Sequence, residues 1–226
     1  MCGRFSLGVD TDALVAEFGT GAAAEHTPRF NIAPTQPVAA VVRGRDGLRF
    51  GSLRWGLVPA GPAPLPRAPL INARAETVAR LPSFAASFHR RRCWVLADGF
   101  YEWRREPDGS RTPFHIRLAD GRPFAFAGIW DRTEGPAGAL PSCAILTTRA
   151  APALAGIHDR MPVILPAPER DRWIDPTASP GDLEPLLRPY DGPLALTRVS
   201  TRVNSVAHDD PSCLEPFHAP PETSRS

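Results

Sequence analysis

The sequence predicts an α+β protein with a single strand-rich core. Many short apolar runs follow one another between residues 38 and 199, whereas helical periodicity is confined to a few short segments. No stretch with the composition of a linker separates two sets of runs, and 226 residues are enough to bury one large core. This pattern is typical of α+β domains in which short helices accompany a sheet.

The first expected element is an amphipathic helix over residues 9–19. Asp10 or Thr11 can cap its first turn, and Gly19 can end it. Residues 59–69 are rich in proline and are expected to form a loop. Residues 218–226 are expected to be disordered. Strands are expected at residues 38–42, 48–57, 93–97, 100–104, 114–118, 124–130, 143–148, 161–165 and 194–199, and further helices at residues 75–91 (with a break near residue 82), 168–174 and 182–187.

The charge of the chain is more informative in its composition than in its sum. A net charge of +2 at pH 7 is too small to indicate a nucleic-acid partner by itself. All 26 basic residues are arginine, and the codon usage of a GC-rich genome explains this. Because the chain has no lysine, the N-terminal amine is its only primary amine. Arginine is also well suited to planar, bidentate contacts with phosphate.

The four cysteines, Cys2, Cys93, Cys143 and Cys213, have neither the spacing of metal ligands nor a dense disulfide pattern. We therefore expect no metal and no cofactor. Cys93 and Cys143 lie in apolar runs and are expected to be buried thiols. The sequence has no secretory signal and no apolar run of the ~20 residues that span a bilayer, so we expect a cytoplasmic protein with reduced thiols.

Cys2 directly follows the initiator methionine. Removal of Met1 would leave an α-amine and a thiol on adjacent carbons, and such a pair can capture an aldehyde first as an imine and then as a thiazolidine. The α-amine titrates near pH ~7.7–8.0, so part of it is nucleophilic at neutral pH. The thiol is the better nucleophile once it is ionised. On position alone, an unprocessed and inert terminus is the simpler interpretation.

Three further polar side chains stand where a packed core does not require them. Asn72 precedes an expected helix, which favours a helix cap over a site residue. Glu102 lies among aromatic residues that can raise its pKa into the range of a general acid, although an outward-facing strand residue fits equally well. His158 lies in a polar turn and suits either proton transfer or a structural contact within that turn.

Several motifs, in this order, resemble one known family. They are MCGRF at residues 1–5, RFNIAPTQ at 29–36, RWGLVP at 54–59, NARAET at 72–77, ADGFYEW at 97–103, AGIW at 127–130, TT at 147–148 and IHDRMP at 157–162. Together they strongly resemble the SOS-response-associated peptidase (SRAP) family, whose members process abasic sites in DNA. The resemblance covers about residues 1–217. It implies one SRAP domain over that range, with a mixed, barrel-like β core flanked by short helices.

The resemblance also implies a function and a site. The chain would be a sensor of abasic sites in single-stranded DNA that forms a covalent crosslink with the lesion in the SOS response. The catalytic positions of the family correspond to Cys2, Asn72, Glu102 and His158. In the implied mechanism, Glu102 assists opening of the sugar ring, the Cys2 amine and thiol close a thiazolidine, His158 moves a proton and Asn72 orients the reacting groups. Autoproteolytic removal of Met1 and a weak strand-cleaving lyase activity are further implications.

Contacts with single-stranded DNA require basic side chains and stacking surfaces. For each arginine named below, an ordinary surface position is the alternative to DNA binding. A core position fits Trp55 as well as a stacking role does. We expect the protein to act as a monomer. The DNA-binding candidates are Arg4, Asn31, Pro34, Trp55, Arg74 and Arg160.

Two other functions are compatible with the sequence. The first is a cysteine peptidase acting on other proteins, in which Cys2 is the N-terminal nucleophile and His158 and Glu102 assist it. The second is a module that binds single-stranded DNA without a covalent bond, in which Cys2 is incidental. A heat-stable crosslink to an abasic oligonucleotide would separate both from the leading interpretation.

Overall fold

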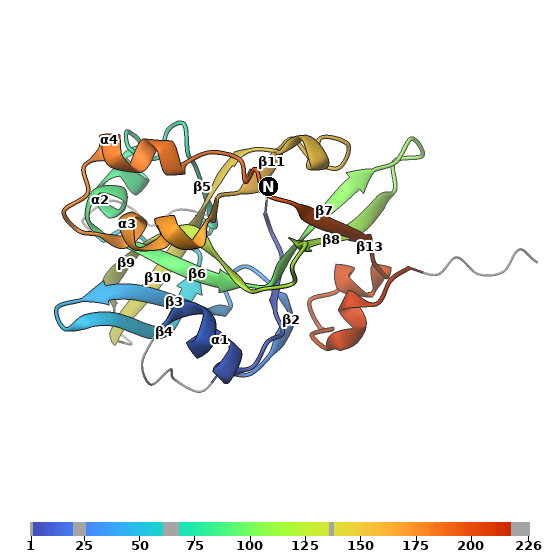
Figure 1. Ribbon diagram of the computed structural model, residues 1–226, viewed down its shortest axis with the longest axis horizontal. Coiled ribbons are helices and arrows are strands. Elements are labelled where there is room, and N and C mark those ends of the chain that lie inside the picture. Colours follow the sequence, from blue (N-terminus) through green and yellow to red (C-terminus); the bar gives the residue numbers. More distant parts are fainter. Residues whose placement is uncertain (1, 20–25, 61–67, 136–137, 218–226) are drawn as a thin grey trace, which may run out of the picture.

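The computed structural model describes residues 2–19, 26–60, 68–135 and 138–217 (Figure 1). Two β-sheets and a set of short helices make up this part of the chain, which confirms the predicted α+β class. The expected tail, residues 218–226, and most of the proline-rich segment lie outside the described residues.

Five strands of the larger sheet close into a barrel. Around the ring, β4 (Gly47–Trp55) pairs with β3 (Pro37–Gly44), β3 with β6 (Arg92–Ala97), β6 with β9 (Phe124–Gly135), and β9 with β10 (Gly138–Arg149). A short parallel pairing between β10 and β4 completes the ring, and all other pairs are antiparallel. This closed ring confirms the expected mixed, barrel-like core, in which side chains of alternate residues fill the interior.

The second sheet brings the N-terminus to the middle of the molecule. It has five strands in the order β13 (Leu194–Arg198), β8 (Arg111–Leu118), β7 (Gly99–Arg105), β1 (Phe5–Leu7) and β2 (Arg29–Ile32), and every pairing is antiparallel. The sequence analysis missed β1 and β2 because neither is long enough to show an alternating pattern. β1 is therefore an interior strand of this sheet, paired on both sides.

Three short strands extend the larger sheet. β5 (Asn72–Arg74) lies parallel to β10, and β11 (Arg160–Pro162) lies antiparallel to it. Both pair with the same β10 residue, Thr147, which is opposite Arg74 in one ladder and Pro162 in the other. The strand β12 (Ile164–Leu165) pairs with β9. β10 thus joins two segments that are far apart in the sequence, and both carry candidate site residues.

The helices are short and lie on the outside of the sheets (Figure 1). The first, α1 (Thr11–Phe18), begins as predicted, with the Asp10 carboxylate accepting a hydrogen bond from the Ala13 N–H at 2.9 Å, and ends at Gly19 with φ 60°. The other helical segments are α2 (Pro82–Arg90), α3 (Arg170–Ile174), α4 (Pro180–Leu183) and the 3₁₀ segments Pro152–Leu154, Ala167–Glu169, Glu184–Leu186, Thr201–Asn204 and Pro211–Leu214.

The helix expected over residues 75–91 is shorter than predicted. α2 begins only at Pro82, and residues 75–80 form turns. The reason is the proline: Leu81, which precedes it, is held in an extended conformation with φ −71° and ψ 126°, and the residue before a proline is disfavoured in the helical region. The predicted break near residue 82 is therefore the start of the helix.

The core joins the two sheets through aromatic side chains. Phe5 of β1 packs edge-on against Trp55 of β4 and Phe126 of β9, with ring centroids 5.1 and 5.7 Å apart. Cys93 and Cys143 are fully buried free thiols, as predicted. Among the described residues, no helix has the length and apolar character needed to cross a bilayer.

Candidate functional site

The pairing of β1 with β7 places Cys2 beside Glu102. Phe5 pairs with Phe100, and the Tyr101 N–H donates a hydrogen bond to the Arg4 carbonyl at 2.9 Å. Continuing the same antiparallel register by one residue puts Gly3 opposite Glu102. Figure 1 shows the start of the chain next to β5 and β7, in agreement with these bonds.

The Cys2 side chain is fully buried. Burial raises the pKa of its thiol well above the ordinary value, and the neighbouring negative charge of Glu102 raises it further. Sγ lies 3.9 Å from the Arg4 carbonyl oxygen. The thiol is therefore protonated at neutral pH in this state.

Asn72 holds the N-terminal residue in place. Its Nδ2 donates a hydrogen bond to the Cys2 carbonyl oxygen at 2.7 Å. Its Oδ1 is buried and accepts no hydrogen bond from the described residues. The residue opens β5 and not a helix, so the interpretation of Asn72 as a helix cap is wrong. A buried amide oxygen of this kind is suited to accept a hydrogen bond from a nearby donor.

Glu102 is a buried carboxyl group in the middle of β7. Only 3% of the residue is exposed, so the alternative of an outward-facing strand residue is wrong. Burial raises its pKa to about 7, and the negative charge of Asp159 acts in the same direction. Near neutral pH the group is therefore divided between its protonated and ionised forms. This is the range in which one carboxyl group can both donate and accept a proton.

His158 lies just before β11 and has two polar contacts at one ring nitrogen. Its Nδ1 is 2.9 Å from the Arg160 N–H nitrogen and 2.9 Å from Asp159 Oδ1. The two contacts make opposite demands, because the backbone N–H needs an unprotonated Nδ1 and the carboxylate oxygen needs a protonated one. Burial lowers the pKa of His158 below its ordinary value. With 29% of the side chain exposed, the ring still reaches solvent.

The three arginine candidates lie in different environments. Arg74 is exposed. The Arg160 guanidinium forms a bidentate ion pair with Glu76, with N–O distances of 2.6 and 2.9 Å, and donates to the Thr147 carbonyl at 2.6 Å. Arg4 is half-buried and donates to Asn31 Oδ1 at 2.7 Å. Arg74 is thus the most accessible of the three for a phosphate.

The apolar and amide candidates are largely internal. Asn31 is fully buried, and its Nδ2 donates to three backbone carbonyls of the C-terminal segment. Trp55 is also fully buried and donates its indole N–H to the Ile71 carbonyl at 2.9 Å, which agrees with the alternative of a core position. Pro34 is half-buried in a turn whose next residue, Thr35, has φ 72°. Only Pro34 among these three offers exposed surface.

Comparisons with known proteins decide the family. The profile of the SOS response associated peptidase (SRAP) family matches residues 1–206. The chain belongs to the SRAP family. The abasic site processing protein YoqW of Bacillus subtilis (strain 168) is 36% identical over 228 residues, covering 95% of this SRAP chain and 99% of that protein. The abasic site processing protein YedK of Escherichia coli (strain K12) is 33% identical over 184 residues, covering 77% and 79% of the two chains.

Solved structures share the fold of this SRAP chain. A crystal structure of a protein from Bacteroides thetaiotaomicron superposes with a TM-score of 0.82 at 23% identity, covering 96% of this chain and 100% of that one. A crystal structure from Bordetella bronchiseptica gives a TM-score of 0.77 at 28% identity, with coverage of 88% and 100%.

Two acidic residues at the SRAP site were not singled out from the sequence. Asp159 contacts His158, and its negative charge raises the pKa of Glu102. Glu76 forms an ion pair with Arg160. Both lie within the motifs, but nothing in a motif shows which side chain faces its neighbour. Within the described part of the chain, no group of His, Cys, Asp and Glu side chains could hold a metal ion.

Proposed function

We propose that this SRAP protein captures abasic sites in single-stranded DNA as a covalent thiazolidine, through Cys2 after removal of Met1. The observation that supports this most directly is the arrangement at the N-terminus. The Cys2 carbonyl is bound by Asn72, next to a buried Glu102 whose pKa is about 7. The relatives in Bacillus subtilis and Escherichia coli are both named abasic site processing proteins.

Opening of the sugar is the first step of the proposed reaction. An abasic deoxyribose is mainly a ring-closed hemiacetal, and the aldehyde appears when the ring oxygen gains a proton and the C1′ hydroxyl loses one. The protonated form of Glu102 donates the first proton, and the carboxylate that results can accept the second. Burial suits Glu102 to this exchange, because it brings the pKa close to neutral pH.

Capture by Cys2 then proceeds in two balanced steps. The α-amine nitrogen attacks the aldehyde carbon, and loss of one water molecule gives the imine. The sulfur then bonds to the same carbon while the thiol proton passes to the imine nitrogen, which closes the thiazolidine. Since the thiol is protonated in the buried site, ring closure requires a base for that proton. We assign this role to the ionised form of Glu102 and the neutral ring of His158, whose pKa values suit it.

Asn72 orients the nucleophile in this scheme. Its Nδ2 fixes the Cys2 carbonyl, and its Oδ1 is a buried acceptor that can receive an N–H of the α-amine. An amine that donates to an amide oxygen keeps its lone pair directed away from that oxygen, towards the aldehyde. Alignment of this kind increases the rate without any change in pKa.

Two side activities follow from the same intermediate and site. An imine at C1′ acidifies the neighbouring C2′ hydrogen, so slow β-elimination can break the strand before the thiazolidine closes. Autoproteolytic removal of Met1 would use the Cys2 nucleophile with Glu102 and His158 as proton carriers. We also propose that the protein acts in the cytoplasm as a monomer, with Arg74 and Arg160 contacting phosphates of the lesion strand.

A crosslinking experiment tests the proposal. The purified protein, with Met1 removal verified by mass spectrometry, is incubated with a single-stranded oligonucleotide carrying one abasic site and separated on a denaturing gel. We expect a heat-stable shifted band that is absent with Cys2→Ser and with a form that retains Met1. Cys213→Ser is the matched control and should crosslink normally. A processed protein that gives no shifted band would contradict the proposal.

A further inference from the structure

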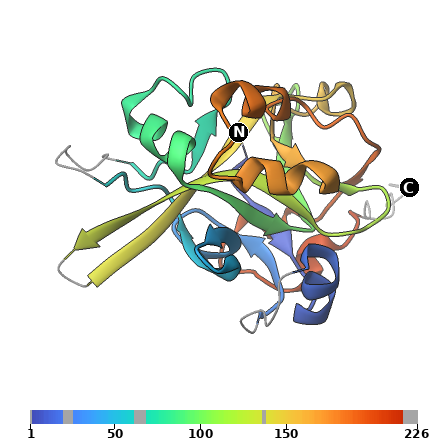
Figure 2. The ribbon, with the colours of Figure 1, turned by 60° about the vertical axis from the view of Figure 1, so that its left-hand side comes forward.

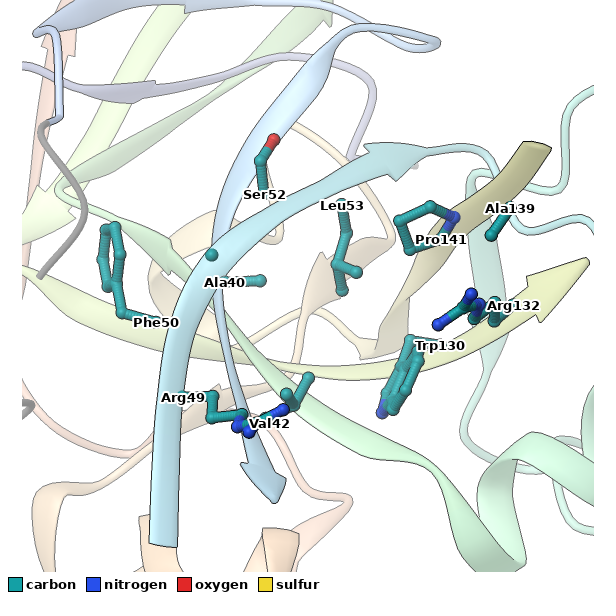
Figure 3. A pocket seen from close by; sticks show the side chains of 11 residues that line it. Ala40, Val42, Arg49, Phe50, Ser52, Leu53, Trp130, Arg132, Ala139 and Pro141 are labelled. Atoms are coloured by element: carbon teal, nitrogen blue, oxygen red, sulfur yellow. The ribbon is translucent and has the colours of Figure 1, made fainter. Parts of the chain in front are cut away.

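A groove lies between the β3–β4 hairpin and the β9–β10 hairpin on the side of the barrel (Figure 3). β10 pairs with β4 only through Ser142 and Cys143, which lie opposite Arg54 and Trp55. Along residues 48–53, β4 pairs with β3 alone among the described strands. The β9–β10 hairpin then projects away from the body, as Figure 2 shows at the left. The space between the hairpins has a volume of about 390 Å³.

This groove exposes one edge of β4. The N–H and C=O groups of successive strand residues point alternately to the two sides. Every second residue between Leu48 and Leu53 therefore directs its backbone groups away from β3 and into the groove. A Cβ built on Gly51, in the middle of this edge, meets no atom within 4 Å. An open edge with a glycine at its centre allows the close approach of another extended backbone.

Trp130 supplies an apolar wall with an available donor. The ring lines the groove beside Leu53 and Pro141 and is half-buried (Figure 3). No acceptor for its indole N–H is found among the described residues, unlike the other tryptophans. Aromatic side chains with one apolar face and one unused polar group are frequent anchors of protein interfaces. The four tryptophans that donate to a protein acceptor are Trp55, Trp94, Trp103 and Trp173.

Two arginines are the charged side chains among the residues that line the groove. Arg49 and Arg132 both line it (Figure 3). Arg49 lies 3.8 Å from Asp46 and Arg132 lies 3.1 Å from Glu134, and all four side chains are more than 60% exposed. Exposed ion pairs of this kind contribute little. Both guanidinium groups can therefore turn to a carboxylate of a ligand at small cost.

We propose that the groove binds an extended acidic segment of a partner protein. Its backbone adds a strand to the open edge of β4, an apolar side chain packs against Trp130, and flanking carboxylates contact Arg49 and Arg132. A peptide fits better than a nucleic acid, because the unpaired backbone edge of β4 offers donors and acceptors at the spacing of a peptide chain. None of Cys2, Asn72, Glu102 and His158 lines this groove, so the proposal is independent of the crosslinking chemistry.

Fluorescein-labelled seven-residue peptides provide the test. Each has aspartates at both ends, valines inside them, and phenylalanine, leucine or valine at the centre; binding is measured by fluorescence anisotropy. Two further forms of the tightest binder carry N-methyl groups on alternate backbone nitrogens. Strand addition uses alternate amides, so we expect one methylated form to lose binding and the other to keep it. Replacement of the aspartates by lysines should also abolish binding.

Variants of the protein locate the site. Gly51→Glu places a negative charge at a groove position where a Cβ meets no atom within 4 Å, and Arg49→Glu reverses a charge on the groove wall. Each should weaken peptide binding by about tenfold or more. Arg105→Glu, an equal change at an exposed position of β7, should bind as the wild type does. Gly51→Glu should also unfold in urea at the wild-type midpoint, which shows that it is folded.

Several results would overturn this assignment. One is no anisotropy change for any of the three peptides at about 1 mM. Others are equal binding of both methylated forms, or unchanged binding to Gly51→Glu. A dimer in light scattering that Gly51→Glu dissociates would show a second copy of the chain as the occupant. Displacement of the peptide by unmodified oligothymidine would show a DNA surface instead.

Discussion

Burial determines the chemistry of single side chains at the N-terminus. Glu102 and Cys2 are within reach of each other in a place that water does not enter freely, and both pKa values rise for that reason. For Glu102 the shift ends near neutral pH, which makes the group an effective proton donor and acceptor. For Cys2 it keeps the thiol protonated, which lowers its reactivity towards oxidants.

Replacement of Glu102 by glutamine removes this proton donor while keeping the shape of the side chain. We expect crosslinking to slow by about 100-fold, because general acid catalysis is lost. In the wild type, the protonated form of Glu102 decreases as the pH rises above about 7, so the rate of crosslinking should fall there because acid-assisted ring opening is lost. The variant should not show this fall in rate. Single-turnover gels across the pH range measure the rate. Binding to a tetrahydrofuran-containing oligonucleotide should not change; an equal loss of binding would make Glu102 structural.

Arg74 provides a second prediction at this scale. It is exposed, and no ion pair with another described residue occupies it. We expect Arg74→Ala to weaken binding to single-stranded DNA of any sequence and to reduce the slope of log K against log salt by about 0.7. Titrations at several salt concentrations measure this slope. Arg105→Ala, at an exposed position of β7, is the control. An unchanged slope in Arg74→Ala would remove this residue from the phosphate contacts.

The identities of the site residues could be predicted from the motifs, but their environments could not. Cys2, Asn72, Glu102 and His158 were all named from the sequence, and the structure brings Cys2, Asn72 and Glu102 together. The protonated state of the Cys2 thiol and the strand position of Asn72 depend on pairings between distant segments. A motif that contains Trp55 cannot show whether the ring faces DNA or the core, because both uses favour the same residue.

At the scale of elements, β1 is held by a buried polar network. The Ser6 hydroxyl donates to Asp98 Oδ1 at 2.6 Å and lies 2.9 Å from His115 Nε2. The three residues come from β1, the turn before β7, and β8. Gly99 must lack a side chain here, because a Cβ would lie 2.0 Å from His115 Nε2. The network fixes the strand that carries Cys2 against the strand that carries Glu102.

This network predicts a pH dependence of stability. Burial lowers the pKa of His115 to about 4, below the unfolded value of about 6.5. The folded chain therefore prefers the neutral ring, and this contribution is complete above pH ~6.5 and decreases as the pH falls towards 4. Burial raises the pKa of Asp98 and offsets part of the loss.

The His115→Gln variant isolates the histidine contribution. Urea unfolding at pH ~7 and ~4.5 should show that acidification costs the wild type about 2 kcal/mol more than the variant. Gln keeps a polar group beside Ser6, so the comparison removes the titration with little change in packing. An equal loss in both proteins would contradict the assignment. A His89→Gln variant serves as the control, because that ring lies at the end of α2, away from the network.

The elements that could be predicted from the sequence are those with clear end signals or a regular apolar pattern. α1 was predicted with its cap because Asp10 and Gly19 are local signals. The short strands β1, β2 and β5 were missed because three or four residues carry no periodicity. β9 and β10 extend beyond their predicted bounds, since the outer end of β9 is polar and that of β10 contains glycine, proline and serine, and only their inner ends are continuous apolar runs. Closure of the barrel depends on long-range pairing, which no local pattern specifies.

The whole molecule is tied together through Asn31. Its buried amide shares its N–H groups among the carbonyls of Val203, Ser205 and His208, and its Oδ1 accepts from Arg4. Asp209 of the same segment accepts from the backbone N–H groups of Phe30 and Asn31. The N-terminal strands and the last described segment therefore form one unit.

Loss of this connection should destabilise the whole fold. We expect Asn31→Ala to reduce the free energy of unfolding by about 2 kcal/mol, because several buried groups lose their partner. For a chain of this size the melting temperature should fall by about 6 °C. Asn204→Ala, which removes only an exposed bond to Trp103, should have a smaller effect. Calorimetry measures both, and equal shifts would show that Asn31 has no special structural role.

The burial of residue 2 has a practical consequence for the proposed reaction. That reaction needs a free α-amine on Cys2, and Cys2 is fully buried. A leader sequence that is not removed at Cys2, or an N-terminal affinity tag, would add residues ahead of this buried position and cover the amine. Recombinant protein for the crosslinking measurements therefore needs its tag at the C-terminus.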